Sequence, residues 1–281
     1  MSPPRVIVGI GEAALIEGDG DPRPGGLACD VALAAVSLGH RGVVVSRVGQ
    51  DARGASLSRA LADAGADVRH LQADPDMPTA RFRYRPDGRP APRNPDGAAF
   101  DQLQWDFDLE DLAREADVAC FGPFAWRSGQ ARSETMRFLH AATAGMRVVD
   151  LANRPDAPDG ETDLLRTHAA AACGLAEVAV ADDAAVRVLL HDRSASAGAD
   201  GLEAVRRRFA LAAMIGVSPG DQWSLATAQG HASSTSPLDP GGIERMRRIL
   251  EIVLALGAGR PGNEALRAAC TRSSSAAAAD R

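Results

Sequence analysis

The chain has 281 residues and a formal net charge of −6, and 45% of its residues are hydrophobic. This length suits one large α/β domain with a substantial core, or two small domains. The acidic balance argues against the basic face that a nucleic-acid partner requires. All 31 basic residues are arginine, which excludes lysine Schiff-base chemistry and a phosphate-loop lysine.

The cysteines and histidines indicate neither a disulfide framework nor a structural metal. The four cysteines lie far apart without a C-x-x-C pair, which is typical of reduced thiols in a cytoplasmic protein. The histidines never reach H-x-x-x-H spacing, so no metal site is predicted. No apolar run reaches membrane length. We therefore predict a cytoplasmic protein with no nucleic-acid or membrane partner.

The N-terminal part of the chain alternates between strand and helix patterns. The periodicity predicts a strand over residues 5–10, a helix over 27–38, a strand over 43–48 and a helix over 55–64. Such alternation predicts a wound α/β sheet. Residues 79–85 then alternate like a strand with one exposed face, ahead of a proline-rich stretch. We expect a small antiparallel flap there, with its strands confined to edges by the prolines.

The alternation resumes after the flap. The expected helices are 109–115, 133–144, 184–190 and 202–210, and the expected strands are 118–121, 147–150, 175–180 and 213–217. No repeat or interdomain linker interrupts this series, which favours one α/β domain.

The last predicted helix begins at a pair of glycines, Gly241 and Gly242. Apolar residues then recur at helical spacing from Ile243 to Val253. A flexible turn that leads into a helix presents free N–H groups and the positive end of the helix dipole. Gly241, Gly242 and Ile243 therefore form a candidate anion hole. The alternative is a loop whose glycines only begin the helix.

Several short motifs, in order and at matching spacing, resemble the ribokinase-like (PfkB-type) family of carbohydrate kinases, and within it the fructokinase branch. The run from Gly25-Gly26 to Asp30 looks like the family's G-G-A-P-A-N turn and helix. Residues 47–54 look like its strand followed by G-x-D-x-x-G, and residues 93–95, 121–123 and 150–155 fit fructokinase-like spacing. The resemblance covers nearly the whole chain.

This resemblance implies an α/β fold, namely a three-layer sandwich with a mostly parallel central sheet flanked by helices and a small β lid. The domain would span residues 1–270, with lid strands from about 13–24 and 79–105, and residues 271–281 would be a disordered tail. Such kinases often form homodimers through the lid, which we expect here as well. A protein partner is a further possibility.

The resemblance also implies a sugar site between the sheet and the lid. Its predicted residues are Glu17, Gly25, Gly26, Asp30, Arg93, Asn94 and Asn153. Asp30 stands where the family has asparagine, and Glu17 (or Asp19) stands where it has an early aspartate. Either acid can accept hydrogen bonds from sugar hydroxyls. The alternative is that Asp30 and Glu17 are solvated turn residues.

The phosphoryl-transfer motifs depart from the family pattern. The family's D-T-x-G-A-G-D is one residue shorter here, so the catalytic base would be Glu244 or Asp239, each displaced. The magnesium motif N-x-x-E is replaced by residues 181–184, which place Asp182 and Asp183 out of register. The nucleotide loop keeps Ser218 and Gly220, but Trp223 replaces its second glycine.

Two functions therefore follow from the resemblance. The first is a sugar-binding relative that has lost efficient phosphoryl transfer, requires no cofactor, and acts by binding, regulation or scaffolding. The alternative is an active kinase that uses ATP and Mg²⁺ to phosphorylate a sugar, with Glu244 or Asp239 as its base. The departures in the C-terminal half favour the first.

Overall fold

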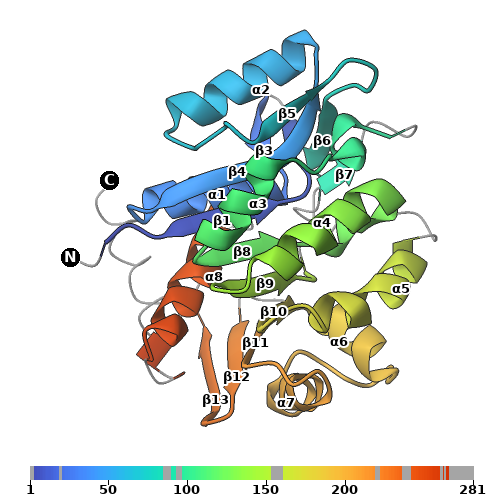
Figure 1. Ribbon diagram of the computed structural model, residues 1–281. Coiled ribbons are helices and arrows are strands. Elements are labelled where there is room, and N and C mark those ends of the chain that lie inside the picture. Colours follow the sequence, from blue (N-terminus) through green and yellow to red (C-terminus); the bar gives the residue numbers. More distant parts are fainter. Residues whose placement is uncertain are drawn as a thin grey trace.

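The computed structural model describes residues 3–18, 21–84, 90–92, 97–152, 161–218, 222–235, 242–259, 262, 264 and 265. A nine-stranded sheet forms the centre of the molecule, and a four-stranded sheet lies beside it (Figure 1). The central sheet runs in the order β13 (Gly230–Thr235), β12 (Gln222–Thr227), β11 (Ala213–Ser218), β10 (Val178–Ala181), β9 (Met146–Asp150), β8 (Val118–Phe121), β1 (Val6–Ile10), β4 (Arg41–Gly49) and β5 (Leu71–Asp74).

The central sheet is mostly parallel. All neighbouring strands from β11 to β5 pair in parallel, and only β12 and β13 are antiparallel. Short runs of β-branched residues such as Val6–Ile10 suit strands that are buried on both faces. Because the strands are parallel, their carboxyl ends open on one edge of the sheet, where ligand sites of such folds form.

Helices cover both faces of the central sheet (Figure 1). On one face lie α1 (Leu27–Ser37) and α8 (Gly242–Gly257), which share an apolar cluster with the sheet. On the other lie α3 (Phe107–Glu115), α4 (Gly129–Ala141), α5 (Glu161–Cys173), α6 (Asp183–Leu190) and α7 (Ala199–Arg208). Helix α2 (Ala52–Asp63) packs with α1 and β4. The predicted sandwich with a mostly parallel sheet is confirmed.

The smaller sheet consists of β3 (Arg23–Gly25), β2 (Ala14–Glu17), β6 (Ala80–Tyr84) and β7 (Pro90–Pro92), in that order. Strand β6 pairs with β2 on one side and with β7 on the other. The expectation that the strand in residues 79–85 lies at an edge of the flap is therefore wrong, because β6 is an interior strand. The edges of the smaller sheet are β3 and β7.

Asp51 ties the smaller sheet to α2. Its carboxylate accepts hydrogen bonds from the N–H of Gly54, at 2.7 Å, and from the N–H and hydroxyl of Thr79, at 2.9 and 2.8 Å. These bonds cap the first turn of α2 and fix the chain just before β6. They also explain why α2 begins at Ala52, three residues earlier than the periodicity predicted.

Aromatic side chains join the smaller sheet to two short 3-10 helices, η1 (Ala99–Gln102) and η2 (Pro123–Arg127). Phe124 of η2 lies 5.8 Å from the rings of both Phe82 and Phe100, centroid to centroid. Arg127 covers the rings of Phe100 and Phe124 and forms a bidentate ion pair with Asp101. This cluster closes the space between the smaller sheet and η2.

The sequence did not predict helix α5 or the hairpin of β12 and β13. Strand β12 begins where a nucleotide loop was expected, and its Trp223 pairs with Val217 of β11. Trp223 is fully buried and shares an apolar cluster with Met246 and Ile249 of α8. Its size therefore fills the core beneath α8.

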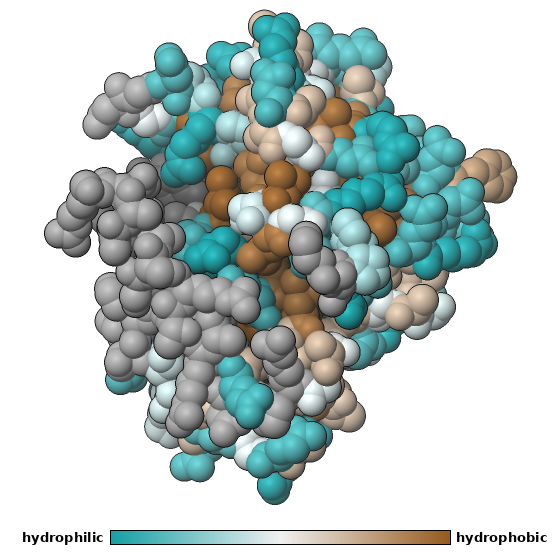
Figure 2. Space-filling view, turned by 90° about the vertical axis from the view of Figure 1, so that its left-hand side faces the viewer, coloured by the Kyte–Doolittle hydropathy of each residue, from teal (hydrophilic) through white to brown (hydrophobic). Residues whose placement is uncertain are grey.

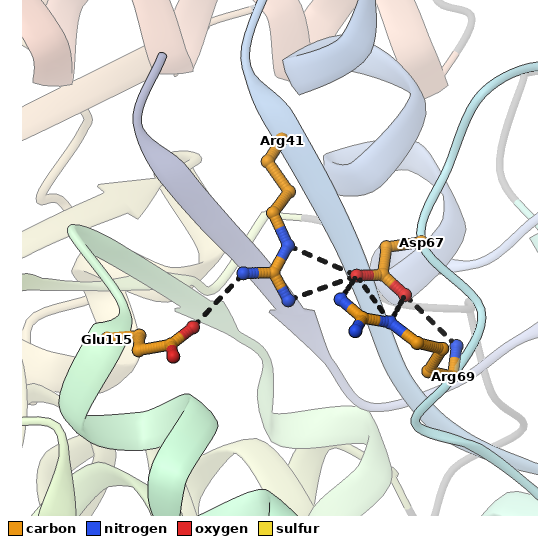
Figure 3. A network of polar contacts seen from close by, with 4 residues as sticks. All are labelled: Arg41, Asp67, Arg69 and Glu115. Atoms are coloured by element: carbon orange, nitrogen blue, oxygen red, sulfur yellow. Dashed lines mark hydrogen bonds and ion pairs between the residues drawn. The ribbon is translucent and has the colours of Figure 1, made fainter. Parts of the chain in front are cut away.

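Ion pairs join elements at the amino ends of the strands, away from the edge described above. Arg41, the first residue of β4, contacts Asp67 and Glu115, and Arg69 contacts the same Asp67 carboxylate (Figure 3). Hydrogen bonds from Arg69 hold the pKa of Asp67 well below its usual range.

On the face turned to the viewer in Figure 2, apolar side chains gather at the centre, with polar ones above and below. None of the helices in the described residues has the length and apolar character needed to cross a membrane.

Candidate functional site

Four elements bring acidic and basic side chains together at the carboxyl edge of the central sheet. Glu12 follows β1, Asp150 ends β9, Asp30 lies in the first turn of α1, and Arg245 lies in the first turn of α8. Glu12 and Asp30 are each 3% exposed, and Asp150 is 1% exposed. We call this group of four side chains the acidic cleft.

Glu12 is buried beside the N-terminus of α1. Its Oε1 accepts a hydrogen bond from the N–H of Leu27 at 3.3 Å, and its Oε2 has no hydrogen-bond partner in the described part of the chain. Burial raises the pKa of the Glu12 carboxyl to about 7. The turn at Gly26 permits this arrangement: its φ is +89°, and a Cβ there would lie 2.6 Å from the Glu12 carbonyl oxygen.

Asp30 lies one turn further along α1, against the start of α8. A Cβ at Gly242 would lie 2.0 Å from Asp30 Oδ2, so only glycine leaves room for this carboxylate. Burial, and next the neighbouring Glu12 carboxylate, raise the pKa of Asp30 to about 7. The position at the N-terminus of α8 that favours an anion therefore faces a carboxyl group of the chain itself.

Arg245 is the cation of this cleft. Its Nη1 and Nη2 donate to Asp150 Oδ2 and Oδ1 at 2.5 and 2.8 Å. The side chains are 14% and 1% exposed, so the pair is largely removed from water. Oδ1 of Asp150 also accepts the N–H of Ala152 at 3.1 Å. The nearby guanidinium of Arg127 is likewise paired, with Asp101.

The structure brings Gly25, Gly26, Asp30 and Gly242 of the predicted site together with Glu12. Glu17, in contrast, pairs with Arg81 of the neighbouring strand β6 at 3.3 Å. Glu244 pairs with Arg247 of its own helix, and Ile243 follows Gly242 in α8. Ser218 ends β11. Arg93, Asn94, Asn153, Gly220, Asp239 and Gly241 lie outside the described residues.

Sequence reasoning missed Glu12, Asp150 and Arg245. Two of them carried a usable signal: Glu12 and Asp150 are acids at the carboxyl ends of buried strands, which meet at one edge of a parallel sheet. The sequence gives no such signal for Arg245, because Arg245 adjoins Glu244 in a charged helix turn. Only the fold shows which of these two side chains faces the sheet.

The acids in the place of the magnesium motif do not fit that metal. Asp182 caps α6 by accepting the N–H of Ala185 at 2.9 Å, and Asp183 accepts the N–H of Ala197 at 2.7 Å. Each of these carboxylates therefore accepts a backbone hydrogen bond. Among the described residues, no group of three or more histidines, cysteines, aspartates or glutamates is placed to hold a metal ion.

The comparisons with known proteins agree with this fold. The family model described as pfkB family carbohydrate kinase matches residues 12–120. No curated protein matches the chain significantly. The resemblance to PfkB-type carbohydrate kinases that the motifs indicated is thus confirmed by the family match and by the ribokinase-like fold.

Solved structures of similar fold cover nearly all of the chain. A fructokinase from Vibrio cholerae O395, in a form bound to fructose, ADP and calcium, has a TM-score of 0.75 at 20% identity, over 95% of this chain and 90% of that one. A PfkB protein from Polaromonas sp. JS666 has a TM-score of 0.72 at 17% identity, over 95% and 93%. A fructokinase from Xylella fastidiosa has a TM-score of 0.70 at 16% identity, over 94% and 86%.

Proposed function

We propose that this chain is a carbohydrate-binding protein of the PfkB type in which phosphoryl transfer to the sugar is at background level. The observation that carries the proposal is the contact between the Asp30 carboxyl group and Gly242 at the start of α8. Kinases hold the transferring phosphate with backbone N–H groups and positive charge. Here a carboxyl group adjoins that helix start, and its ionised form repels phosphate.

The base and the metal acids support the same proposal. Hydrogen bonds from Arg247 lower the pKa of Glu244, whereas an efficient general base has a pKa near the working pH. Asp182 and Asp183 serve backbone hydrogen bonds instead of a magnesium ion. The competing proposal is an ATP- and Mg²⁺-dependent, fructokinase-like kinase, with Asp239, outside the described residues, or Glu244 as base.

Sugar binding is the part of the kinase function that the cleft favours. Buried acids with a free oxygen, such as Glu12, are suited to accept hydrogen bonds from the hydroxyls of a polyol. We therefore add Glu12 to the proposed sugar contacts, alongside Gly25, Gly26 and Asp30. The predicted contacts Arg93, Asn94 and Asn153 remain part of this proposal, and the fructose-bound structure from Vibrio cholerae makes ketohexoses the first compounds to try.

Calorimetry and an ADP-release assay on the purified chain test the proposal. We expect a hexose or ketohexose to bind with a Kd of about 1 mM or lower, which corresponds to about −4 kcal/mol. ADP release with Mg²⁺ and ATP should not rise above background with any sugar. Sugar-dependent turnover that Glu244→Gln abolishes, in a variant with an unchanged melting temperature, would make the kinase proposal right and ours wrong.

We further propose a homodimer formed through the smaller sheet. Because β6 is an interior strand, pairing between subunits has to use β3 or β7, or a face of the sheet. Light scattering at micromolar protein should give twice the chain mass of 29.2 kDa. A mass of one chain would contradict this proposal without affecting the proposal on sugar binding.

A further inference from the structure

The acidic cleft holds more buried carboxyl groups than its own cations can neutralise. Glu12 and Asp30 are both 3% exposed and lie at the first turn of α1, where Glu12 accepts the N–H of Leu27. The Glu12 carboxylate, after burial, raises the pKa of Asp30, so it lies within electrostatic range of Asp30. Neither takes part in an ion pair found among the described residues. Oε2 of Glu12 is fully buried with no donor in that part of the chain.

The charged groups that face these two acids come from several elements. Glu12 is faced by Arg127 of η2 and by Asp150 of β9. Asp30 is faced by Arg23 of β3, Arg245 of α8, Asp150 and Glu12. Two of these arginines are committed elsewhere, since Arg245 binds Asp150 and Arg127 binds Asp101, each by two hydrogen bonds. Arg23 is exposed, so water screens its charge.

A buried carboxylate without a partner is costly, so such a group either stays protonated or meets a donor. A hydroxyl can donate one hydrogen bond but brings no charge. An ammonium group donates three and neutralises the charge that two ionised carboxylates would bring into the cleft. The arrangement of Glu12 and Asp30 therefore favours a ligand with a positive charge over a neutral one of the same shape.

We propose that the cleft binds a polyol bearing a primary amine, an amino sugar or amino-deoxy sugar alcohol, with its ammonium group donating to Glu12 Oε2 and to the Asp30 carboxylate. This inference rests on the proposed sugar binding and narrows its substrate class. The ammonium ion displaces the protons that Glu12 and Asp30 hold near neutral pH, so binding releases protons to the solvent.

Proton release gives binding a defined dependence on pH. An acid with a pKa of about 7 has to lose its proton before it pairs with an ammonium group, so the affinity falls about tenfold per acid between pH 8 and pH 6. An aliphatic amine like that of lysine keeps its charge across this range. The parent sugar alcohol releases no proton and should show little change.

The experiment is calorimetry of 1-amino-1-deoxyhexitols, each compared with its parent hexitol, at pH 6, 7 and 8 in buffers of different ionisation enthalpy. We expect the amine to bind at least tenfold more tightly than its parent at pH 8, and to lose that advantage by pH 6. Glu12→Gln should reduce the advantage about tenfold. Glu115→Gln, in the ion-pair network with Arg41 at the amino end of β4 (Figure 3), should retain it.

Three results would overturn the inference. Equal affinities for amine and parent without proton release would leave sugar binding intact but remove the ammonium site. Binding of ammonium chloride as tight as that of the amine would indicate a site for a small cation. Silence of both series would overturn the inference, and silence of hexoses and ketohexoses as well would contradict the proposed sugar binding. If Glu12→Gln fails to fold, the pH profile of amine binding and the proton release of the wild-type protein decide whether the ammonium site exists.

Discussion

Arg245 and Asp150 form a bidentate ion pair that joins the first turn of α8 to the end of β9. Asp150 is 1% exposed, so the pair is largely removed from water. The pair therefore fixes the position of α8 over the carboxyl edge of the sheet, where the acidic cleft lies.

Removal of this arginine should destabilise the chain strongly. Arg245→Met removes the bidentate partner of the buried Asp150 carboxylate, at a cost of about 3–5 kcal/mol in the free energy of unfolding. Urea unfolding measures this cost. The control is Arg114→Met, which breaks exposed pairs with Glu110 and Asp111 and should cost no more than about 1 kcal/mol. Equal costs for the two variants would mean that the Asp150 charge is solvated.

The buried acid Asp30 should make the unliganded protein less stable as the pH rises. Its pKa is raised from 3.8 to about 7, so the folded state binds more protons than the unfolded state between these values. The slope of the free energy of unfolding with pH is then negative. Relative to wild type, Asp30→Asn should gain up to about 4 kcal/mol from pH 4 to pH 8, at ~1.4 kcal/mol per pKa unit.

Urea unfolding at several pH values follows this difference between Asp30→Asn and wild type. Asp111→Asn, at an exposed position of α3, should show no such pH-dependent gain. A difference that shrinks as the pH rises would contradict the assignment.

The contact between Gly242 and Asp30 can be tested by a double-mutant cycle. Gly242→Ala places a methyl group 2.0 Å from the original position of Asp30 Oδ2, and should cost about 1–3 kcal/mol. In an Asp30→Ala background the same substitution should cost less, with a coupling of at least about 0.5 kcal/mol. Gly129→Ala, whose Cβ meets nothing within 4 Å, is the matched control. Additive effects of the two substitutions would show that the residues do not touch.

The aromatic cluster should hold the smaller sheet against η2. Phe124→Ala removes the ring between Phe82 and Phe100 and should cost about 3–5 kcal/mol if the cavity stays empty. Hydrogen exchange should then accelerate in β2 and β6 before it does in β1. Phe124→Leu should have a smaller effect on both measurements. Uniform acceleration of exchange across all strands would mean that the smaller sheet does not unfold locally, apart from the central sheet.

The sequence predicted the central architecture because its signals are local. Runs such as Val6–Ile10 and Val118–Phe121 mark buried parallel strands by composition alone. Helix α5 was not predicted from the sequence because its many alanines make the difference between its apolar and polar faces small. The hairpin of β12 and β13 was not predicted because residues 218–223 resemble a nucleotide loop, although residues 222–227 pair as a strand with both neighbours.

The site was harder to predict because its parts meet only through tertiary structure. Gly25, Gly26 and Asp30 follow one another along the chain, so a motif could indicate them. Glu12 and Asp150 depend on the alignment of strand ends, and Arg245 depends on the rotation of α8 about its axis. Sequence spacing within one helix turn cannot decide which of Glu244 and Arg245 faces the cleft.

The packing of α1 on α8 has a consequence for synthesis of the protein. Asp30 near one end of the chain touches Gly242 near the other, and Val31 and Ala35 share an apolar cluster with Met246 and Ile249. When β1, α1 and β4 leave the ribosome, the surface of α1 that receives α8 is still uncovered. Domains emerge from the N-terminus, so the group of Glu12, Asp30, Asp150 and Arg245 is among the last parts of this molecule to be completed. A chain that ends before α8 would keep Glu12 and Asp30 but would lack Gly242, which lies against Asp30, and Arg245, which pairs with Asp150.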